Sequence, residues 1–263
     1  MIRIDCRGVP LEDLASSEQI RAAADCFTRH GYAILDNVVS KEKIERLHRE
    51  FLDGYSRFLK DEETDEVRQV GYQRYMLSLK LSGGFADPEI FANPYVVALV
   101  RQVLEASAIL EAFGLVVSLP GAPAQVSHFD GPHLFASELS VMLPAYALTF
   151  ALPLIEMNEH HGTTNLSPGS HRWRREQEDQ EKLEISPLVP TGSCLFWDFR
   201  LRHRGTTNRS TTPRPMLYCT YARPWYKDPV NFQDGKQMRR VDVDPSFVAG
   251  LPESTRHLFA HLG

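Results

Sequence analysis

The chain has few of the features that mark exported or thiolate-rich proteins. Its four cysteines, Cys6, Cys26, Cys194 and Cys219, are widely spaced and form no CxxC pair. This spacing favours reduced thiols in a cytoplasmic protein over a disulfide framework or a zinc site. The first residues include acidic side chains and lack the apolar segment of a secretory signal, so we expect no export signal.

Long apolar runs and a large excess of one charge are also missing. The most apolar stretch, Leu139 to Ile155, contains Pro144 and Pro153 and is too short and too broken to span a membrane. With 29 basic and 34 acidic residues, the net charge of -5 gives no general attraction to nucleic acid or to an anionic membrane. We therefore expect a small-molecule substrate as the partner, while the oligomeric state is left open.

No internal repeat or low-complexity linker divides the 263 residues, which predicts one domain over 1–263. The part up to about residue 107 is predicted to be helical with one strand at 32–36. Helices are expected after Ser17, after Ser40, and from Asp87 through Leu104. The charged run 60–68 is predicted to be a solvated loop, and the tail 227–263 is expected to wrap the rest.

From about residue 108 to 226 the pattern changes to short strands separated by turns. The expected strands are 113–119, 124–130, 146–154, 192–197 continuing toward 203, and 215–222. Several short strands with regular turn signals favour a β-sandwich or barrel. The prediction is a mainly β protein with the N-terminal helices packed on the outside.

His128 and Asp130 are the first candidates for chemistry. On a strand, residues two apart face the same side, so both side chains could reach one metal ion while Phe129 points away. The alternative is a surface histidine beside a turn aspartate, because Gly131 and Pro132 mark a turn.

His203 ends a run with period-two alternation, the pattern of a half-buried strand. One predicted face is apolar and faces inward: Leu195, Trp197, Phe199, Leu201 and His203. The other predicted face holds Asp198, Arg200 and Arg202. The alternative for His203 is a core histidine whose ring is hydrogen-bonded to a backbone carbonyl.

Arg214 opens the next expected strand after the polar turn 205–213. An antiparallel hairpin would bring it near the strand of His203 and place it on one face with Met216, Tyr218 and Thr220. A buried guanidinium is costly unless it meets an anion, such as a dicarboxylate cosubstrate or an internal carboxylate. Two histidines, one carboxylate and this arginine could build a non-haem Fe(II) site with an anchor for a keto acid.

Four segments together resemble the phytanoyl-CoA dioxygenase family of Fe(II)/2-oxoglutarate oxygenases. They are SHFD at 127–130, NEHHGTTNLSPGSHRW at 158–173, GSCLFWDFRLRHRGTTNRSTTPRP at 192–215 and YCTYARPWY at 218–226. The resemblance covers roughly residues 20–226. It implies a double-stranded β-helix, or jelly-roll, with iron at its mouth. It also implies that His128, Asp130 and His203 bind iron and that Arg214 binds the distal carboxylate of 2-oxoglutarate.

The resemblance suggests two further contacts to the cosubstrate. Many relatives have a glutamine three residues before the first ligand, where Gln125 stands here. Strict alternation would place Gln125 on the opposite face from His128, so its role requires an irregular strand. Thr149 is the second expected contact. The segment 162–171 matches the family's turn only in part, and its His171 is interpreted as structural.

The implied reaction uses Fe(II), 2-oxoglutarate and O2 to hydroxylate or otherwise oxidise a small molecule, releasing succinate and CO2. The presence of Asp130 disfavours a halogenase. Since there is no compact basic cluster for a CoA phosphate, we expect a specialised or secondary metabolite as the substrate. The residues expected to shape the substrate pocket are Tyr72, Tyr75, Phe129, His133, Phe135 and Trp225. The alternatives are a jelly-roll metalloenzyme that does not use 2-oxoglutarate and a non-catalytic binding protein of the same fold.

Overall fold

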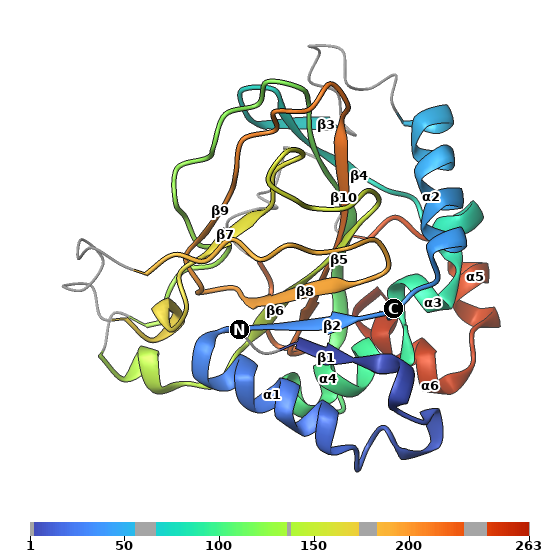
Figure 1. Cartoon of the computed structure of the whole chain (residues 1–263). Helices are drawn as coiled ribbons and strands as arrows, with labels where there is room; N and C mark the ends of the chain where they lie inside the picture. Colours follow the sequence, from blue (N-terminus) through green and yellow to red (C-terminus); the bar gives the residue numbers. More distant parts are fainter. Residues whose placement is uncertain (1–2, 56–66, 136–137, 174–182, 229–240, 263) are drawn as a thin grey trace.

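A large, mostly antiparallel β-sheet forms the centre of the computed structural model, which describes residues 3–55, 67–135, 138–173, 183–228 and 241–262 (Figure 1). In spatial order its strands are β1 (Arg3–Asp5), β2 (Tyr32–Asp36), β8 (Cys194–Asp198), β6 (Ala147–Pro153), β10 (Arg214–Ala222), β5 (Ile109–Ser118), β4 (Arg74–Ser78) and β3 (Val67–Gly71). A second sheet pairs β7 (Thr164–Leu166) with β9 (His203–Gly205). The mainly β, jelly-roll prediction is confirmed.

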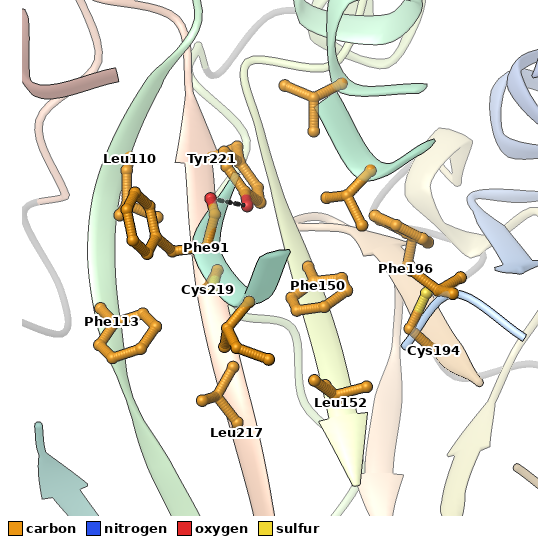
Figure 2. Packing of buried hydrophobic residues seen from close by; sticks show 14 of the residues in the cluster. Phe91, Leu110, Phe113, Phe150, Leu152, Cys194, Phe196, Leu217, Cys219 and Tyr221 are labelled. Carbon is orange, nitrogen blue, oxygen red and sulfur yellow. Dashed lines mark hydrogen bonds between the residues drawn. The ribbon is translucent and has the colours of Figure 1, made fainter. Parts of the chain in front are cut away.

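The two faces of the large sheet have different roles. On β10, Leu217, Cys219 and Tyr221 belong to the main hydrophobic cluster beneath the helices (Figure 2). The intervening Tyr218 and Thr220 line a cavity on the other face. Because side chains alternate along a strand, one sheet both closes the core and forms a wall of the cavity.

The helices lie against the large sheet on the side away from β7 and β9 (Figure 1). The α-helices are α1 (Glu18–His30), α2 (Lys41–Gly54), α3 (Pro88–Phe91), α4 (Pro94–Leu104), α5 (Pro245–Gly250) and α6 (Glu253–Arg256). Short 3-10 turns are η1 (Cys6–Gly8), η2 (Leu11–Asp13), η4 (Gly83–Ala86), η5 (Glu138–Met142), η6 (Ser170–Arg172) and η8 (His257–Leu262). Within the described ranges, no helix is long and apolar enough to cross a membrane.

The ends of the first two helices agree with the sequence prediction. Ser17 and Ser40 cap α1 and α2 by accepting backbone N–H groups, and Gly31 ends α1 in a left-handed conformation. The single helix predicted from Asp87 through Leu104 is wrong, because the chain forms α3 and α4 there. Asn93 is extended before Pro94, as expected because a proline disfavours helical geometry in the residue before it.

One hydrophobic cluster includes residues from the N-terminal helices, the sheet and the C-terminal segment. Within it, the Tyr221 hydroxyl donates a 2.7 Å hydrogen bond to the carbonyl oxygen of Phe91, which satisfies a buried polar group (Figure 2). Phe259 of the C-terminal segment packs edge-on against Phe91, with ring centroids 5.6 Å apart. Side chains of the segment 241–262 therefore belong to the same core.

The N-terminal part contains more strands than the one predicted. β3 and β4 form an antiparallel hairpin that extends the large sheet beside β5. Residues 60–66 of the predicted charged loop lie outside the described residues, but Val67 and Arg68 already belong to β3. The loop prediction is wrong for these two residues because pairing with β4 overrides the polar composition of the segment.

Two predictions about the strands near the cavity are also wrong. Segment 124–130 is not a strand, and only His128 makes an isolated bridge, to His203. The strand from residue 192 ends at Asp198, where a turn leads to β9. The Asp198 side chain accepts hydrogen bonds from the backbone N–H and the guanidinium of Arg200. Both residues are buried as an ion pair, although the alternation placed them on the outer face.

The predicted hairpin between the strands of His203 and Arg214 does not form. β9 pairs with β7, whereas β10 lies between β5 and β6 in the large sheet. The two residues nevertheless line the same cavity.

Candidate functional site

His128 and His203 are held side by side by their backbones. The N–H of each residue donates to the carbonyl oxygen of the other, at 2.9 Å and 2.8 Å. Their ring centroids lie 4.5 Å apart. The bridge fixes the loop before Asp130 against β9, so that both rings face the cavity.

The tautomer of each ring follows from its backbone neighbour. Nδ1 of His128 lies 2.9 Å from the carbonyl oxygen of Val126, and Nδ1 of His203 lies 2.9 Å from that of Leu201. A carbonyl can only accept, so Nδ1 carries the hydrogen and Nε2 keeps its lone pair. Burial lowers the pKa of His203, opposed by Asp130 and aided by His128, which favours the neutral ring that a metal requires.

Asp130 is oriented by two donors on the sheet beneath it. The Thr149 hydroxyl and the Trp197 indole N–H both donate to Oδ2, each at 2.8 Å. These two residues are register partners on β6 and β8, so their side chains rise from the same face. The other oxygen, Oδ1, lies 3.5 Å from Nε2 of His203.

Among the described residues, the group that could hold a metal ion is His128, Asp130 and His203, whose ligand atoms all lie within 4.8 Å of one another. Two neutral imidazoles and one carboxylate are the ligand set of non-haem Fe(II) oxygenases and leave coordination positions open. Backbone carbonyl groups orient both rings, and Thr149 and Trp197 orient the carboxylate, which is the support that a metal site requires. The residues present therefore fit an iron ion.

A cavity of about 660 Å³ opens next to these three side chains. Of the aromatic residues predicted to shape the substrate pocket, Tyr72 and Phe129 line it. Tyr75 does not, because it faces the hydrophobic core and is 3% exposed, while its neighbours on β4 face the cavity. That prediction is corrected.

Three other predicted pocket residues also lie off the cavity wall. Phe135 and Trp225 project into solvent, and His133 lies in the loop that follows Gly131. Sequence proximity to the metal-ligand candidates suggested His133, and aromatic character suggested the other two, but none of the three lines the cavity.

Arg214 lies at the start of β10, lines the cavity and is only 1% exposed. Its Nε and Nη1 atoms have no hydrogen-bond partner within the described part of the chain. Burial, and secondarily the charge of Arg74, lower the pKa of Arg214 to about 9. No internal salt bridge, the alternative considered from sequence, is found for it among those residues, so the site favours an anion.

Arg74 is a cavity residue that sequence reasoning missed. It is 1% exposed, and burial lowers its pKa to about 10. Its Nη2 donates to the carbonyl oxygens of Pro123 and Thr206. β4 was not predicted as a strand. Had it been, the alternation of side chains would have placed Arg74 and Met76 on the face opposite the buried Tyr75.

Gln125 and Thr149, the other expected cosubstrate contacts, both line the cavity. Oε1 of Gln125 accepts the N–H of Gly205 at 2.9 Å, so the amide side chain is tied to β9. Since 124–130 is not a strand, alternation does not constrain the direction of Gln125. The Thr149 hydroxyl hydrogen points to Asp130, which leaves only its lone pairs for a ligand.

Solved structures with this fold include the non-heme alpha ketoglutarate dependent epimerase SnoN from nogalamycin biosynthesis. SnoN is 17% identical to this chain, covers 84% of it and 92% of its own length, and gives a TM-score of 0.62. AviO1 from Streptomyces viridochromogenes Tue57 is 19% identical, covering 79% of this chain and 96% of its own, with a TM-score of 0.60. At these sequence identities the similarity shows a shared fold and nothing more specific.

Curated relatives are dioxygenases. Multifunctional dioxygenase ausE from Penicillium brasilianum is 23% identical over 214 residues, covering 75% of this chain and 69% of that protein. Dioxygenase FUM3 from Gibberella moniliformis is 26% identical over 102 residues, or 38% of this chain, and the match spans only about a third (34%) of FUM3. The family described as phytanoyl-CoA dioxygenase (PhyH) matches residues 27–216. The chain therefore belongs to the phytanoyl-CoA dioxygenase (PhyH) family.

Proposed function

We propose that the protein is an Fe(II)/2-oxoglutarate-dependent oxygenase that oxidises a small organic molecule, with release of succinate and CO2. The observation that carries this proposal is the position of Arg214, a buried guanidinium without a described partner, in the same cavity as the three ligand candidates. One cavity thus offers both a metal site and an anion site.

In this proposal Nε2 of His128, Nε2 of His203 and Oδ1 of Asp130 hold the iron. The Arg214 fork pairs with the distal carboxylate of 2-oxoglutarate, because guanidinium and carboxylate match in a planar, bidentate geometry. When bound, iron with 2-oxoglutarate and O2 supplies the two-electron oxidation of substrate.

The chain's own residues supply geometry and a sheltered site. Thr149 and Trp197 hold Asp130 in one rotamer, so the carboxylate keeps its direction when a ligand enters. The buried cavity wall limits access of water, which strengthens the pairing between Arg214 and an anion.

A small specialised metabolite is the substrate class that we favour. The cavity volume of about 660 Å³ falls within the range of small-molecule sites, roughly 300–1,000 Å³. SnoN is described as part of nogalamycin biosynthesis, and a SnoN complex holds Fe3+, alpha ketoglutarate and nogalamycin RO. The partner in our proposal is therefore a small molecule rather than nucleic acid or a membrane. The four cysteines are buried as thiols and not joined in disulfides, which supports the reducing, cytoplasmic setting that we propose.

The alternatives explain fewer observations. A jelly-roll metalloenzyme that does not use 2-oxoglutarate would have no use for the buried charge of Arg214. A non-catalytic protein would not need two oriented histidines and a doubly held carboxylate. A halogenase would need space where Asp130 stands.

The test is succinate formation by the purified protein with Fe(II), ascorbate and 2-oxoglutarate, since turnover without the true substrate is often detectable. Calorimetric titration of 2-oxoglutarate into Mn(II)-loaded protein reports binding separately from turnover. We expect 2-oxoglutarate to bind. We also expect succinate to form, and its formation to stop when a metal chelator is added. Absence of both binding and succinate would refute the proposal.

A further inference from the structure

Asp228 is a buried acidic residue on the cavity wall that the proposed ligand set does not use. It is 1% exposed and lines the same cavity as the three ligand candidates. It follows β10 in the chain, six residues after the last residue of that strand, Ala222. Burial of a carboxylate is costly unless cations or hydrogen-bond donors compensate for it. Its position in a ligand cavity therefore carries information about the ligand.

An irregularity in β5 fixes the place of Asp228. The pairing of β10 with β5 shifts after Thr220, and Glu111 is the residue of β5 that has no partner across β10. Such an extra residue is a β-bulge, which redirects side chains next to functional sites. Oε1 of Glu111 accepts the backbone N–H of Asp228 at 3.3 Å. The segment that follows β10 is thus held close to Thr220.

This part of the wall lies at the metal end of the cavity, away from Arg214. Thr220 is the register partner of Thr149, whose hydroxyl group holds Asp130. Arg214 lies six residues earlier on β10, roughly 20 Å along the strand. β10 itself lies between β5 and β6 (Figure 1). In the proposed function the cosubstrate extends from the metal toward Arg214, which leaves the side of Asp228 for the substrate.

Two hydroxyl groups of β10 line the cavity without a hydrogen-bond partner in the described part of the chain. They belong to Tyr218 and Thr220, which are 7% and 4% exposed. The ring of Tyr218 passes close to Gly114 on β5, where a Cβ atom would lie 2.7 Å from the hydroxyl oxygen. Burial, and after it nearby acidic groups that include Asp228, raise the pKa of Tyr218, so its hydroxyl stays protonated. Buried hydroxyl groups without a partner are rare, and a bound substrate would satisfy them.

We propose that Asp228, together with the hydroxyl groups of Tyr218 and Thr220, receives an amino group of the substrate, so that the substrate class is a small molecule that carries an amine. This inference rests on the proposed function. An ammonium group has three N–H donors, and one carboxylate and two hydroxyl oxygens supply three acceptors. The cavity then separates two charges, with the cosubstrate anion at Arg214 and the substrate cation at Asp228.

The test uses three probes that share one ring and differ in charge. Cyclohexylmethylamine is a cation at neutral pH, cyclohexylmethanol is neutral and cyclohexanecarboxylate is an anion. Each is titrated without oxygen into protein loaded with Mn(II) and 2-oxoglutarate, and calorimetry measures the affinity. Broadening of the NMR lines of the probe by Mn(II) reports whether it lies next to the metal. We expect wild type to bind the amine at least about tenfold more tightly than the alcohol, the usual effect of a hydrogen bond to a charged group, and the carboxylate most weakly.

Asp228→Asn removes the charge and keeps the shape of the side chain. We expect the affinity for the amine to fall by at least about tenfold, to the level of the alcohol, while the affinity for the alcohol stays within about twofold. Asp25→Asn is the matched control, because it removes the same charge from the exposed face of α1. Tyr218→Phe should weaken amine binding by about 2–10-fold, the effect of losing a neutral hydrogen bond. Thermal unfolding checks the fold of each variant.

The outcomes separate this inference from the proposed function. If wild-type protein does not bind 2-oxoglutarate, the proposed function fails. If it binds 2-oxoglutarate but binds the amine no better than the alcohol, or not at all, the amine site is overturned. The same holds if Asp228→Asn keeps the preference for the amine, or if Mn(II) does not broaden the lines of the bound amine. If Asp228→Asn does not fold, the order of the three probes on wild type and the effect of Tyr218→Phe decide.

Discussion

The hydroxyl group of Thr149 donates a 2.8 Å hydrogen bond to Oδ2 of Asp130. The indole N–H of Trp197 donates to the same oxygen at the same distance. Both donors rise from the floor formed by the large sheet, whereas Asp130 belongs to a loop. The rigid sheet thus sets the direction of a carboxylate that the loop alone would leave mobile.

Removing these donors should weaken metal binding. We expect Thr149→Val and Trp197→Phe each to reduce the affinity for Fe(II) or Mn(II) by roughly 10–100-fold, the usual effect of removing a hydrogen bond that orients a metal ligand. Metal titration followed by calorimetry measures this effect. Thr255→Val, on α6 and away from the cavity lining, should bind metal like wild type. Unchanged metal affinity in both site variants would contradict the orienting role.

Arg214→Ala should weaken 2-oxoglutarate binding much more than metal binding. The loss of a charge-assisted, bidentate pair in a buried site costs about 2–5 kcal/mol. Arg214→Lys should recover only part of this, because an ammonium group cannot reproduce the planar fork. Calorimetry with separate titrations of metal and keto acid distinguishes the two effects. Unchanged keto-acid affinity in Arg214→Ala would exclude Arg214 as the anchor.

The ion pair at the turn before His203 should matter for stability. Arg200→Met leaves the Asp198 carboxylate buried without its guanidinium partner, which costs about 3–5 kcal/mol of the free energy of unfolding. Urea unfolding measures this loss. Arg204→Met, which breaks a half-exposed pair with Glu184, should cost about 1 kcal/mol or less. Similar values for the two variants would show that burial of the first pair is unimportant.

Local signals in the sequence predicted a good part of the fold. Ser17, Ser40 and Gly31 mark helix ends through hydrogen bonds within a few residues, so the bounds of α1 and α2 could be read from the chain. The mainly β core and its strands β5, β6, β8 and β10 followed from apolar periodicity. These features depend on interactions between near neighbours in sequence.

The features that were missed depend on partners distant in sequence. β3 and β4 are short, and they become strands because they pair with each other and because β4 pairs with β5, a partner distant in sequence. The alternation of apolar and polar residues continues through 195–203, yet the strand ends at Asp198, whose carboxylate forms an ion pair with Arg200. The place of Arg74 requires both this sheet register and the space left by Gly205, two facts separated by more than a hundred residues.

Asp130→Ala provides the decisive test of the proposed ligand set. The carboxylate is one of three ligand candidates, and its loss should abolish or greatly reduce succinate release and oxygen uptake. The fold should survive, because Asp130 lies at the cavity and outside the hydrophobic clusters. The donors of Thr149 and Trp197 lose their acceptor, so we expect a stability loss in the range of about 0.5–3 kcal/mol.

Two controls make the result of Asp130→Ala interpretable. Circular dichroism and thermal unfolding verify the fold, and Asp25→Ala, on the exposed face of α1, should keep wild-type turnover. Calorimetry should show that metal affinity falls together with activity, since a missing ligand affects both. Wild-type turnover in a folded Asp130→Ala protein would mean that two histidines suffice, and the assignment of Asp130 as a ligand would be wrong.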